Sequence, residues 1–168
     1  MVVVVVAKYK EDTKWSDDLD SFVVQKEIHM DNWGREPSSF LWYIINHYDE
    51  LEGYYAFVQG NPFDHCHNLI SDVNKDPLTG FEWLGDTNYL TDENGSPYHT
   101  GLPVKHICDL LGLEVKYPIY FARGGQFLVH SNRIKFKPKG FYESCLQLIK
   151  ELDQAEYVFE RIWRELFR

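Results

Sequence analysis

The stretch 31–65, DNWGREPSSFLWYIINHYDELEGYYAFVQGNPFDH, decides how this chain folds. Apolar side chains recur at helical spacing after Pro37, which suits the first turn of a helix because the backbone donor that it lacks would be unpaired there. The stretch therefore predicts an amphipathic helix over residues 37–48. The apolar and aromatic run 54–58, YYAFV, is typical of a strand that is buried on both faces.

The two ends of this predicted helix–strand unit both favour a ligand, and we expect them to converge on one pocket that holds Arg35, Asn61 and Asp64. The helix entrance carries Asn32, Gly34 and Arg35. Backbone donors, the positive end of the helix dipole and a guanidinium would thus lie together, and such a place attracts anions. Ligands of open α/β sheets bind beyond the carboxyl ends of the strands. The strand delivers polar or small residues to that edge, namely Gln59, Gly60, Asn61, Asp64 and His65.

Length and charge limit the classes of protein that this chain can belong to. Its 168 residues are enough for one domain with a substantial core. With 26 acidic and 17 basic residues the net charge is -9, which argues against tight binding to nucleic acid or to an anionic membrane. The valine run 2–6 is too short to span a bilayer and predicts a strand of a parallel sheet. The three cysteines, widely spaced and without a CxxC pair, favour a reducing, cytoplasmic setting.

Periodicity and turn residues outline the rest of a single α/β domain over residues 1–168, with a mostly parallel sheet flanked by helices. Glycine, proline, asparagine and aspartate are dense over 74–103, which predicts a loop or lid at the ligand site. We expect further strands over 22–25, 118–121 and 126–129. We expect helices over 15–19, 65–73, 104–111, 141–152 and 155–167, the last two covering the sheet.

Several motifs resemble a little-characterised family of glycosyltransferase-like domains found in fungi, bacteria and viruses. The main ones are Asn32-Trp33-Gly34-Arg35-Glu36 and, after the helix, FVQGNPFDH at 57–65. AKYKED at 7–12, GGQFLV at 124–129 with FYE at 141–143, and ERIW at 160–163 with Leu166-Phe167 continue the likeness over nearly the whole chain. The family usually has Asn where Lys10 stands. The chain is more distantly similar to GT-A-type glycosyltransferases, and this implies a GT-A-like, Rossmann-like fold.

The resemblance implies transfer of a sugar from a uridine or guanosine diphosphate donor to a glycan or other hydroxyl acceptor. It places Tyr9 against the base, and Glu11 or Asp12 on the base or ribose. The other donor-binding residues that it implies are Lys8, Asn32, Gly34, Arg35, Glu36, Gln59, Gly125 and Gln126. The residues themselves leave alternatives open: Glu11 and Asp12 could form an acidic first helical turn, Arg35 could pair with Glu36 or Asp64, and the glycines could make an ordinary tight turn.

The polar residues that follow the predicted strand 54–58 could also bind a metal ion. GT-A enzymes hold Mn²⁺ or Mg²⁺ with an Asp-x-Asp motif, but this chain has Gln59-Gly60-Asn61 there, and its first carboxylate comes at Asp64. Asn61, Asp64 and His65 are our candidate metal ligands. Alternatively Lys8 and Arg35 neutralise the phosphates without a metal, or Asp64 caps the helix predicted over 65–73. A zinc site on His65-Cys66-His67 lacks a second ligand pair.

Candidate catalytic residues follow from the need to remove a proton from the acceptor hydroxyl. Asp64 and Glu160 are the candidates that we name, and Asp86 and Asp92 in the turn-rich stretch are also eligible. Glu160 could instead pair with Arg161 as a structural bridge. The missing Asp-x-Asp supports an alternative, a non-catalytic glycan- or protein-binding domain with the same fold. A metal-dependent hydrolase that uses Asp64, His65 and His67 is a third hypothesis.

Overall fold

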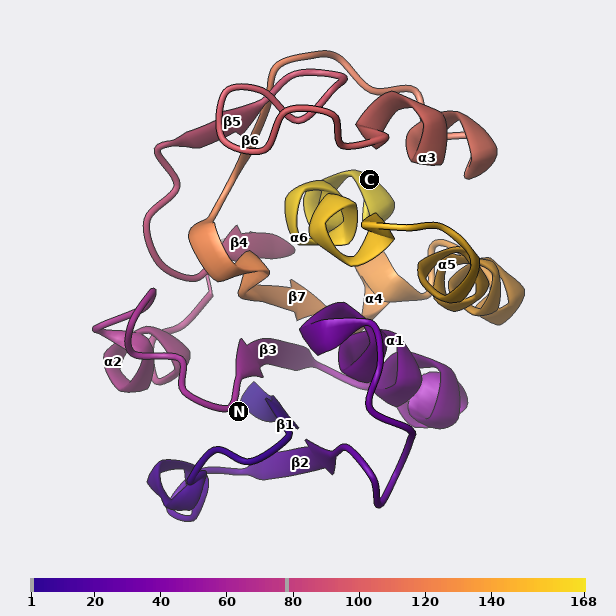
Figure 1. The fold of residues 1–168 in the computed structure, drawn as a ribbon. Coiled ribbons are helices and arrows are strands. Elements are labelled where there is room, and N and C mark those ends of the chain that lie inside the picture. Colours follow the sequence, from indigo (N-terminus) through magenta and orange to yellow (C-terminus); the bar gives the residue numbers. More distant parts are fainter. Residues whose placement is uncertain (1, 78) are drawn as a thin grey trace.

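The computed structural model describes residues 2–77 and 79–168, which form one five-stranded sheet, a separate two-stranded sheet and the surrounding helices (Figure 1). The strands are β1 (Val2–Lys8), β2 (Ser21–Gln25), β3 (Tyr54–Gln59), β4 (Phe81–Trp83), β5 (Tyr89–Thr91), β6 (Ile119–Phe121) and β7 (Phe127–His130). The α-helices are α1 (Arg35–His47), α2 (Leu69–Val73), α3 (Val104–Leu110), α4 (Ser131–Ile134), α5 (Lys139–Glu151) and α6 (Ala155–Leu166). Short 3₁₀ turns form η1 (Lys14–Ser16), η2 (Tyr48–Glu50) and η3 (Arg123–Gly125).

The main sheet has the strand order β2-β1-β3-β7-β4 and is mixed. Strand β1 pairs in parallel with β2 and with β3, and places Val5 opposite both Phe22 and Phe57. Strand β7 runs antiparallel to its two neighbours, β3 and β4. The α/β class is thus confirmed, whereas the mostly parallel character that we expected is not, since two of the four ladders are antiparallel.

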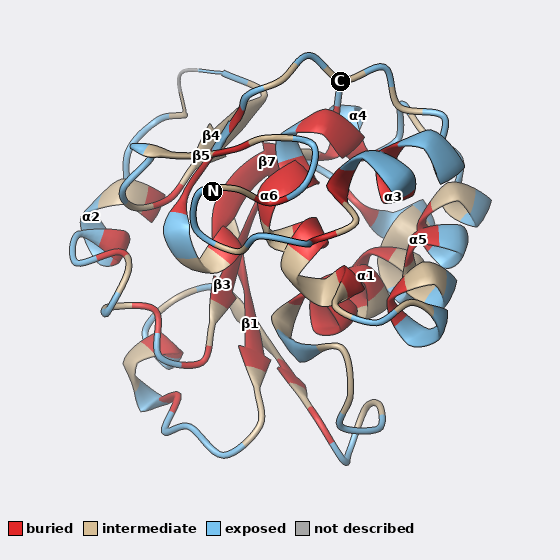
Figure 2. Ribbon diagram, turned by 45° about the horizontal axis from the view of Figure 1, so that its top comes forward, coloured by how far each residue is buried: buried red, intermediate tan, exposed pale blue. Residues whose placement is uncertain are grey.

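Strand β1 separates two hydrophobic clusters because its side chains alternate between the faces of the sheet. Val5 and Phe57 face the larger cluster, to which α1, α5 and α6 contribute. Figure 2 shows buried positions along each of these three helices. Val4 and Val6 face a smaller cluster with Leu69 of α2. Val4, Val5 and Val6 are at most 1% exposed, as expected for a β-branched run inside a sheet covered on both faces.

Helix α1 is joined to the sheet and to α6 through aromatic contacts. The ring of Phe40 lies 5.5 Å from that of Phe57, 5.9 Å from that of Phe127 and 5.9 Å from that of Trp163, measured between centroids. All four side chains are at most 1% exposed, and each such burial contributes roughly 1.5–3 kcal/mol. The amphipathic helix predicted over 37–48 is confirmed, although it begins two residues earlier, at Arg35.

Three local predictions are wrong in extent. The helix predicted over 65–73 is confined to α2; residues 63–65 form a separate turn, in which the backbone N–H groups of His65 and Cys66 both donate to the carbonyl of Pro62. Asp64 therefore does not cap a helix that begins at His65. The helix predicted over 15–19 is only the turn η1, and the stretch 74–103 is not all loop, since it contains β4 of the main sheet and β5.

The described residues include no helix that is long and apolar enough to cross a bilayer. Cys66, Cys108 and Cys145 are free and buried. Burial raises the pKa of all three thiols, that of Cys66 to about 11. Thiols held neutral in this way are poor nucleophiles and poor metal ligands, so the cysteines act here as small core residues.

Candidate functional site

A cavity of about 240 Å³, which we call the first cavity, opens where β1 and β2 end and α1 begins. Since β1 and β2 are parallel, this is the carboxyl edge at which ligands of open α/β sheets bind. Six of the eleven predicted donor-binding residues line it, namely Lys8, Tyr9, Glu11, Asn32, Arg35 and Glu36. Ala7 and Lys26 complete the lining.

The turn into α1 depends on glycine. Gly34 and Arg35 both have left-handed backbones, with φ of 65° and 49°. A Cβ atom at Gly34 would lie 2.7 Å from Cγ2 of Ile149 and 2.8 Å from Cβ of Ser38. Gly34 therefore shapes the cavity without lining it, and its role is structural.

Arg35 lies between an acidic and an aromatic neighbour. Its Nε is 3.5 Å from Oε2 of Glu36, and its guanidinium carbon lies 5.3 Å from the ring centroid of Tyr157 in α6. The side chain remains 49% exposed, so part of the guanidinium is open to a ligand. No side chain in the described part of the chain caps α1, which leaves its first backbone donors available to the same ligand.

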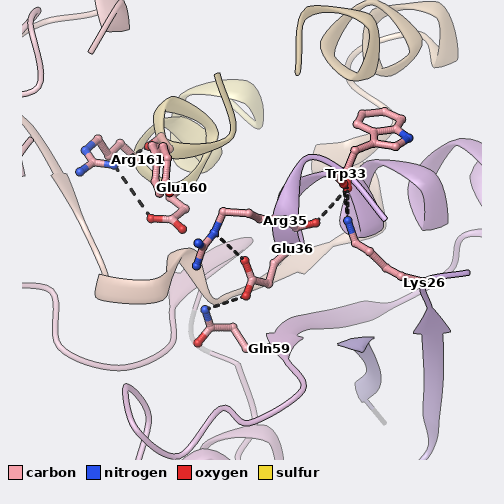
Figure 3. Close-up of polar contacts among 9 residues, drawn as sticks. Lys26, Trp33, Arg35, Glu36, Gln59, Glu160 and Arg161 are labelled. Atoms are coloured by element: carbon pink, nitrogen blue, oxygen red, sulfur yellow. Dashed lines mark hydrogen bonds and ion pairs between the residues drawn. The ribbon is translucent and has the colours of Figure 1, made fainter. Parts of the chain in front are cut away.

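Lys26 is the cavity residue that the sequence analysis missed. It is 4% exposed, and its Nζ donates to the backbone carbonyl of Trp33 and, at 2.8 Å, to Oγ of Ser38 (Figure 3). Burial lowers its pKa to about 8, against the opposing effect of Glu36. A lysine directly after a strand is normally read as solvent-exposed, so periodicity offered no signal of its burial.

Glu36 connects the first cavity to the end of β3. Its Oε1 accepts a hydrogen bond of 3.3 Å from Nε2 of Gln59, and the two side chains point toward each other in Figure 3. The backbone N–H of Gln59 in turn donates to Oε1 of Gln126 at 3.0 Å, and Nε2 of Gln126 donates to the carbonyl of Pro62 at 3.2 Å. Gln126 is fully buried, and both the oxygen and the nitrogen of its side-chain amide form hydrogen bonds to backbone groups. It supports the site and does not face a ligand.

Glu160 projects from α6 toward Arg35 and Glu36 (Figure 3). A Cβ atom at Gly125 would lie 3.0 Å from its Cα, so the glycine turn η3 packs directly on this part of α6. Burial, and secondly the charge of Glu36, raise the pKa of Glu160 to about 7, although Arg161 and Arg35 oppose the shift. The carboxyl group can therefore take up or release a proton near neutral pH.

The alternative pairing of Glu160 with Arg161 is a loose one. Oε2 of Glu160 lies 4.0 Å from Nη1 of Arg161. Arg161 instead donates from Nη1 to the backbone carbonyl of Tyr157, and its guanidinium carbon lies 4.9 Å from the ring centroid of Phe121. Its principal contacts anchor α6 to β6, which leaves the Glu160 carboxyl group only weakly neutralised.

A second cavity, of about 400 Å³, lies on the other side of Gln59. A Cβ atom at Gly124 would be 2.6 Å from the His65 ring, which lines this cavity, and 3.2 Å from Oε1 of Gln59. Gln59 also contacts Glu36 of the first cavity, so Gln59 and the turn at Gly124 lie between residues of the two cavities. The second cavity is lined by Asp64, His65, Cys66, His67, Asn68, Asp72, Gly85, Asp86, Tyr89 and Arg123.

The structure does not bring Arg35 and Asp64 into one pocket, contrary to our expectation. Arg35 lines the first cavity and Asp64 the second, because Gln59 and the turn at Gly124 stand between them. Glu160, the other catalytic candidate, approaches from α6 at Gly125 and lines neither. The two candidate catalytic residues therefore do not share a cavity: Asp64 lines the second cavity, and Glu160 lies on α6 next to Gly125.

The proposed metal ligands do not form an assembled site. Nδ2 of Asn61 donates to Oδ2 of Asp64 at 3.2 Å, which occupies one carboxylate oxygen. Among residues 2–77 and 79–168 no three His, Cys, Asp or Glu side chains are close enough to hold one ion. The set Asn61, Asp64 and His65 contains only one carboxylate. Because Mg²⁺ and similar ions need several oxygen ligands, these three side chains do not fit a divalent cation by themselves.

Three other predicted carboxylates hold turns. Glu11 accepts from the backbone N–H groups of Tyr9 and Lys10, at 2.7 and 3.1 Å. Asp12 accepts from the backbone N–H of Lys14 at 3.0 Å, just before η1, but neither it nor Glu11 lies in a first helical turn, so that alternative is wrong. Asp92 accepts from the backbone N–H groups of Asn94 and Ser96 at 2.8 and 2.9 Å, a structural use that argues against a catalytic one.

Searches against protein-family models, curated proteins and solved structures found no match to this chain.

Proposed function

We propose that this protein is a GT-A-like glycosyltransferase, which moves a sugar from a nucleotide-diphosphate donor to a hydroxyl acceptor. The observation that carries the proposal is the first cavity. It gathers the cations Lys8, Lys26 and Arg35, the ring of Tyr9 and the uncapped start of α1 at the carboxyl edge of parallel strands. Cations and backbone donors of this kind suit a diphosphate, and an aromatic ring suits a nucleobase.

The first cavity would bind the donor and stabilise its leaving group. Negative charge builds on the diphosphate as the bond to the sugar breaks, and fixed positive groups lower the barrier when they face that charge. Arg35 is suited to this role because its fork of donors can hold two phosphate oxygens at once. In the proposal Lys8 adds a second positive charge, and Tyr9 stacks on the base.

The second cavity would hold the acceptor. For transfer, the Gln59 side chain or the turn at Gly124 would have to move aside so that the acceptor oxygen reaches the anomeric carbon of the donor. A base removes the proton of the acceptor hydroxyl, the oxygen bonds to the anomeric carbon, and the electrons of the broken bond leave with the diphosphate. Asp64 faces the second cavity, whereas Glu160 has a raised pKa of about 7 that suits proton transfer. Comparison of Asp64→Asn with Glu160→Gln separates these two bases, since only loss of the true base lowers kcat while donor affinity is kept.

We also propose a divalent cation, Mn²⁺ or Mg²⁺, as the cofactor, and nucleotide binding can test this. Because the donors at Asn61, Asp64 and His65 do not fit an ion by themselves, we assign no step of the reaction to it. An ion that bound only together with the donor diphosphate would increase nucleotide affinity and would leave the protein alone metal-free.

The direct test is calorimetric titration with uridine and guanosine diphosphates, with and without Mn²⁺. We expect one of the two to bind, and we expect Arg35→Ala to weaken it while the circular dichroism spectrum is unchanged. Slow hydrolysis of the matching nucleotide sugar without an acceptor should be lost in the same variant. If the wild type binds neither nucleotide under any of these conditions, the proposal fails.

A non-catalytic glycan- or protein-binding domain is the second candidate. The bond between Asn61 and Asp64, where related enzymes would hold a metal, favours it. Donor hydrolysis that depends on Arg35 would exclude this alternative, whereas glycan binding without any nucleotide affinity would support it. For either function we propose a cytoplasmic location, since all three cysteines are free in the structure.

A further inference from the structure

Lys26 is a buried cation on the wall of the first cavity. Its side chain is 4% exposed, yet it is among the lining residues. It follows β2 directly, and its backbone N–H donates to the carbonyl of Lys8 at 2.9 Å, which continues the pairing with β1. Its position is thus determined by the sheet, while its ammonium reaches the turn that starts α1.

One of the three N–H donors of the Lys26 ammonium has no acceptor among the described residues. A protonated lysine carries three N–H donors. Within the described residues two of them are used, by the carbonyl of Trp33 and by Oγ of Ser38. Oγ of Ser38 also lies 2.6 Å from the Trp33 carbonyl and 2.9 Å from that of Arg35, so the ammonium is held in place against the turn. A buried charge with an unused donor is costly unless a ligand completes its partners.

We propose that Lys26 is the deep anion contact of the first cavity, where its ammonium donates to an oxyanion of a nucleoside diphosphate and takes up a proton as that anion binds. This inference deepens the proposed function, on which its choice of ligand rests. Beyond the proposed function, it identifies Lys26 as the contact residue and couples proton uptake to anion binding.

The electrostatics of the cavity support proton uptake. Burial lowers the pKa of Lys26 to about 8; Glu36 opposes this shift and Arg35 adds to it. An anion beside the ammonium favours its charged form and must raise that pKa. The charged or titratable groups that face Lys26 across the cavity are Lys8, Tyr9, Glu11, Arg35 and Glu36.

The coupling has a measurable size. With a pKa of about 8, Lys26 is partly deprotonated in the unliganded protein at pH 8. If the anion raises the pKa by about one unit, about 0.4 proton enters per anion bound at this pH. Affinity should accordingly fall between pH 7 and pH 10, by about eightfold for the same shift.

Calorimetry measures this proton directly. Uridine diphosphate is titrated at pH 8 in two buffers of different ionisation enthalpy, and the difference in apparent heat gives the number of protons taken up. The ligand itself is fully ionised at this pH, because its last phosphate pKa lies near 6. We expect uptake of a few tenths of a proton, whereas uptake of zero would overturn the proposal.

Two matched variants assign the proton to its residue. Lys26→Arg keeps the positive charge but cannot titrate, so we expect the uptake to fall to the smaller share that the Glu160 carboxyl group, with its pKa of about 7, contributes at pH 8. Lys8→Arg, at a less buried lysine of the same cavity, should keep it. If Lys26→Arg does not fold, the wild type still decides the matter: the NMR shift of the Lys26 Cε should titrate near pH 8 and move to higher pH with ligand. Unchanged titration would contradict the proposal.

Sulfate serves as a second probe, because it does not titrate in this range and carries no nucleoside. Sulfate binding with proton uptake, but without uridine diphosphate binding or donor hydrolysis, would support the anion contact and contradict sugar transfer. If Lys26→Arg still transfers sugar and its pH dependence is unaltered, this result would support sugar transfer and contradict the anion contact. Failure of both anions to bind would overturn the inference together with the donor site.

Discussion

The two cavities lie on either side of Gln59 and are built from different parts of the fold. The first is enclosed by the ends of β1 and β2 and the start of α1, which the core holds in place. The second is enclosed mainly by turns, over 64–68 and 85–89 and at Arg123. Groups on rigid elements keep their geometry when no ligand is present, whereas turns can adapt to several ligands.

The charges of the two cavities differ as well. Three cations and two carboxylates line the first, and one carboxylate, that of Glu11, is already bound by two backbone donors. Three carboxylates and one arginine line the second, namely Asp64, Asp72, Asp86 and Arg123. The difference indicates that an anion binds in the first cavity and a neutral or positively charged molecule in the second. Four predictions test this contrast, described from the largest expected effect to the smallest.

Gly34→Ala should be the most damaging change, because it distorts the entrance of the first cavity. Its Cβ would meet Ile149 and Ser38 at 2.7 and 2.8 Å, and its φ is 65°. We expect a loss of about 3 kcal/mol in the free energy of unfolding, measured with urea. Gly112→Ala is the control: its φ is 64°, but nothing lies within 4 Å, so backbone strain alone should cost about 1 kcal/mol. Equal losses would show that the contacts are irrelevant.

Glu160→Gln tests the carboxyl group at the boundary between the cavities. The folded protein holds this proton more tightly than the unfolded chain, since the pKa is raised from 4.5 to about 7. Wild-type stability should therefore fall as the pH rises from 4.5 to 7, by about 2–3 kcal/mol. The variant lacks this loss and should exceed the wild type in stability at pH 8, but not at pH 4.5. Glu143→Gln on α5 is the control, and a similar gain there would refute the assignment.

Arg35→Ala and Arg123→Ala compare the cavities directly. Loss of Arg35 removes a charge-assisted contact to phosphate, worth about 2 kcal/mol or roughly thirtyfold in nucleotide affinity. Loss of Arg123 should leave nucleotide affinity within about twofold, since Arg123 lines only the second cavity. Calorimetry with uridine or guanosine diphosphate measures both. The reverse ranking would place the nucleotide in the second cavity.

Asp86→Asn should have the smallest effect. Oδ1 of Asp86 accepts from the backbone and the side chain of Asn88, at 3.0 and 2.7 Å, and an asparagine oxygen can accept the same bonds. We expect a change below about 0.5 kcal/mol in stability and none in nucleotide affinity. A lower affinity for the acceptor would place Asp86 at the acceptor, whereas loss of nucleotide binding would contradict the separation of the cavities.

Much of the fold could be predicted from the sequence because its signals are local. The spacing of Phe40, Leu41 and Ile44 predicted α1, and the valine run predicted β1. Local reasoning failed at α2, which is shorter than the helix predicted over 65–73, because residues 63–65 form a separate turn and Asp64 does not cap a helix. It also missed β4, a strand of three residues in a stretch rich in turn-forming residues.

The candidate site was predicted in part. The motif at 32–36 located Asn32, Arg35 and Glu36 on the first cavity, since residues of one turn stay together in any fold. Gln126 was predicted to face a ligand but is fully buried and supports β3 instead. Lys26 was missed because a buried lysine gives no sign of its burial in the sequence.

By itself the sequence determined which segments form α1, β1 and β3, and it placed an anion-attracting turn before the helix, because these features depend on neighbours within a few residues. Only the tertiary structure decided that Gly125 packs on Glu160, that Lys26 is buried under the turn at Gly34, and that Arg35 and Asp64 line different cavities. These features arise from contacts between residues far apart in the chain. Local spacing carries no information about such contacts.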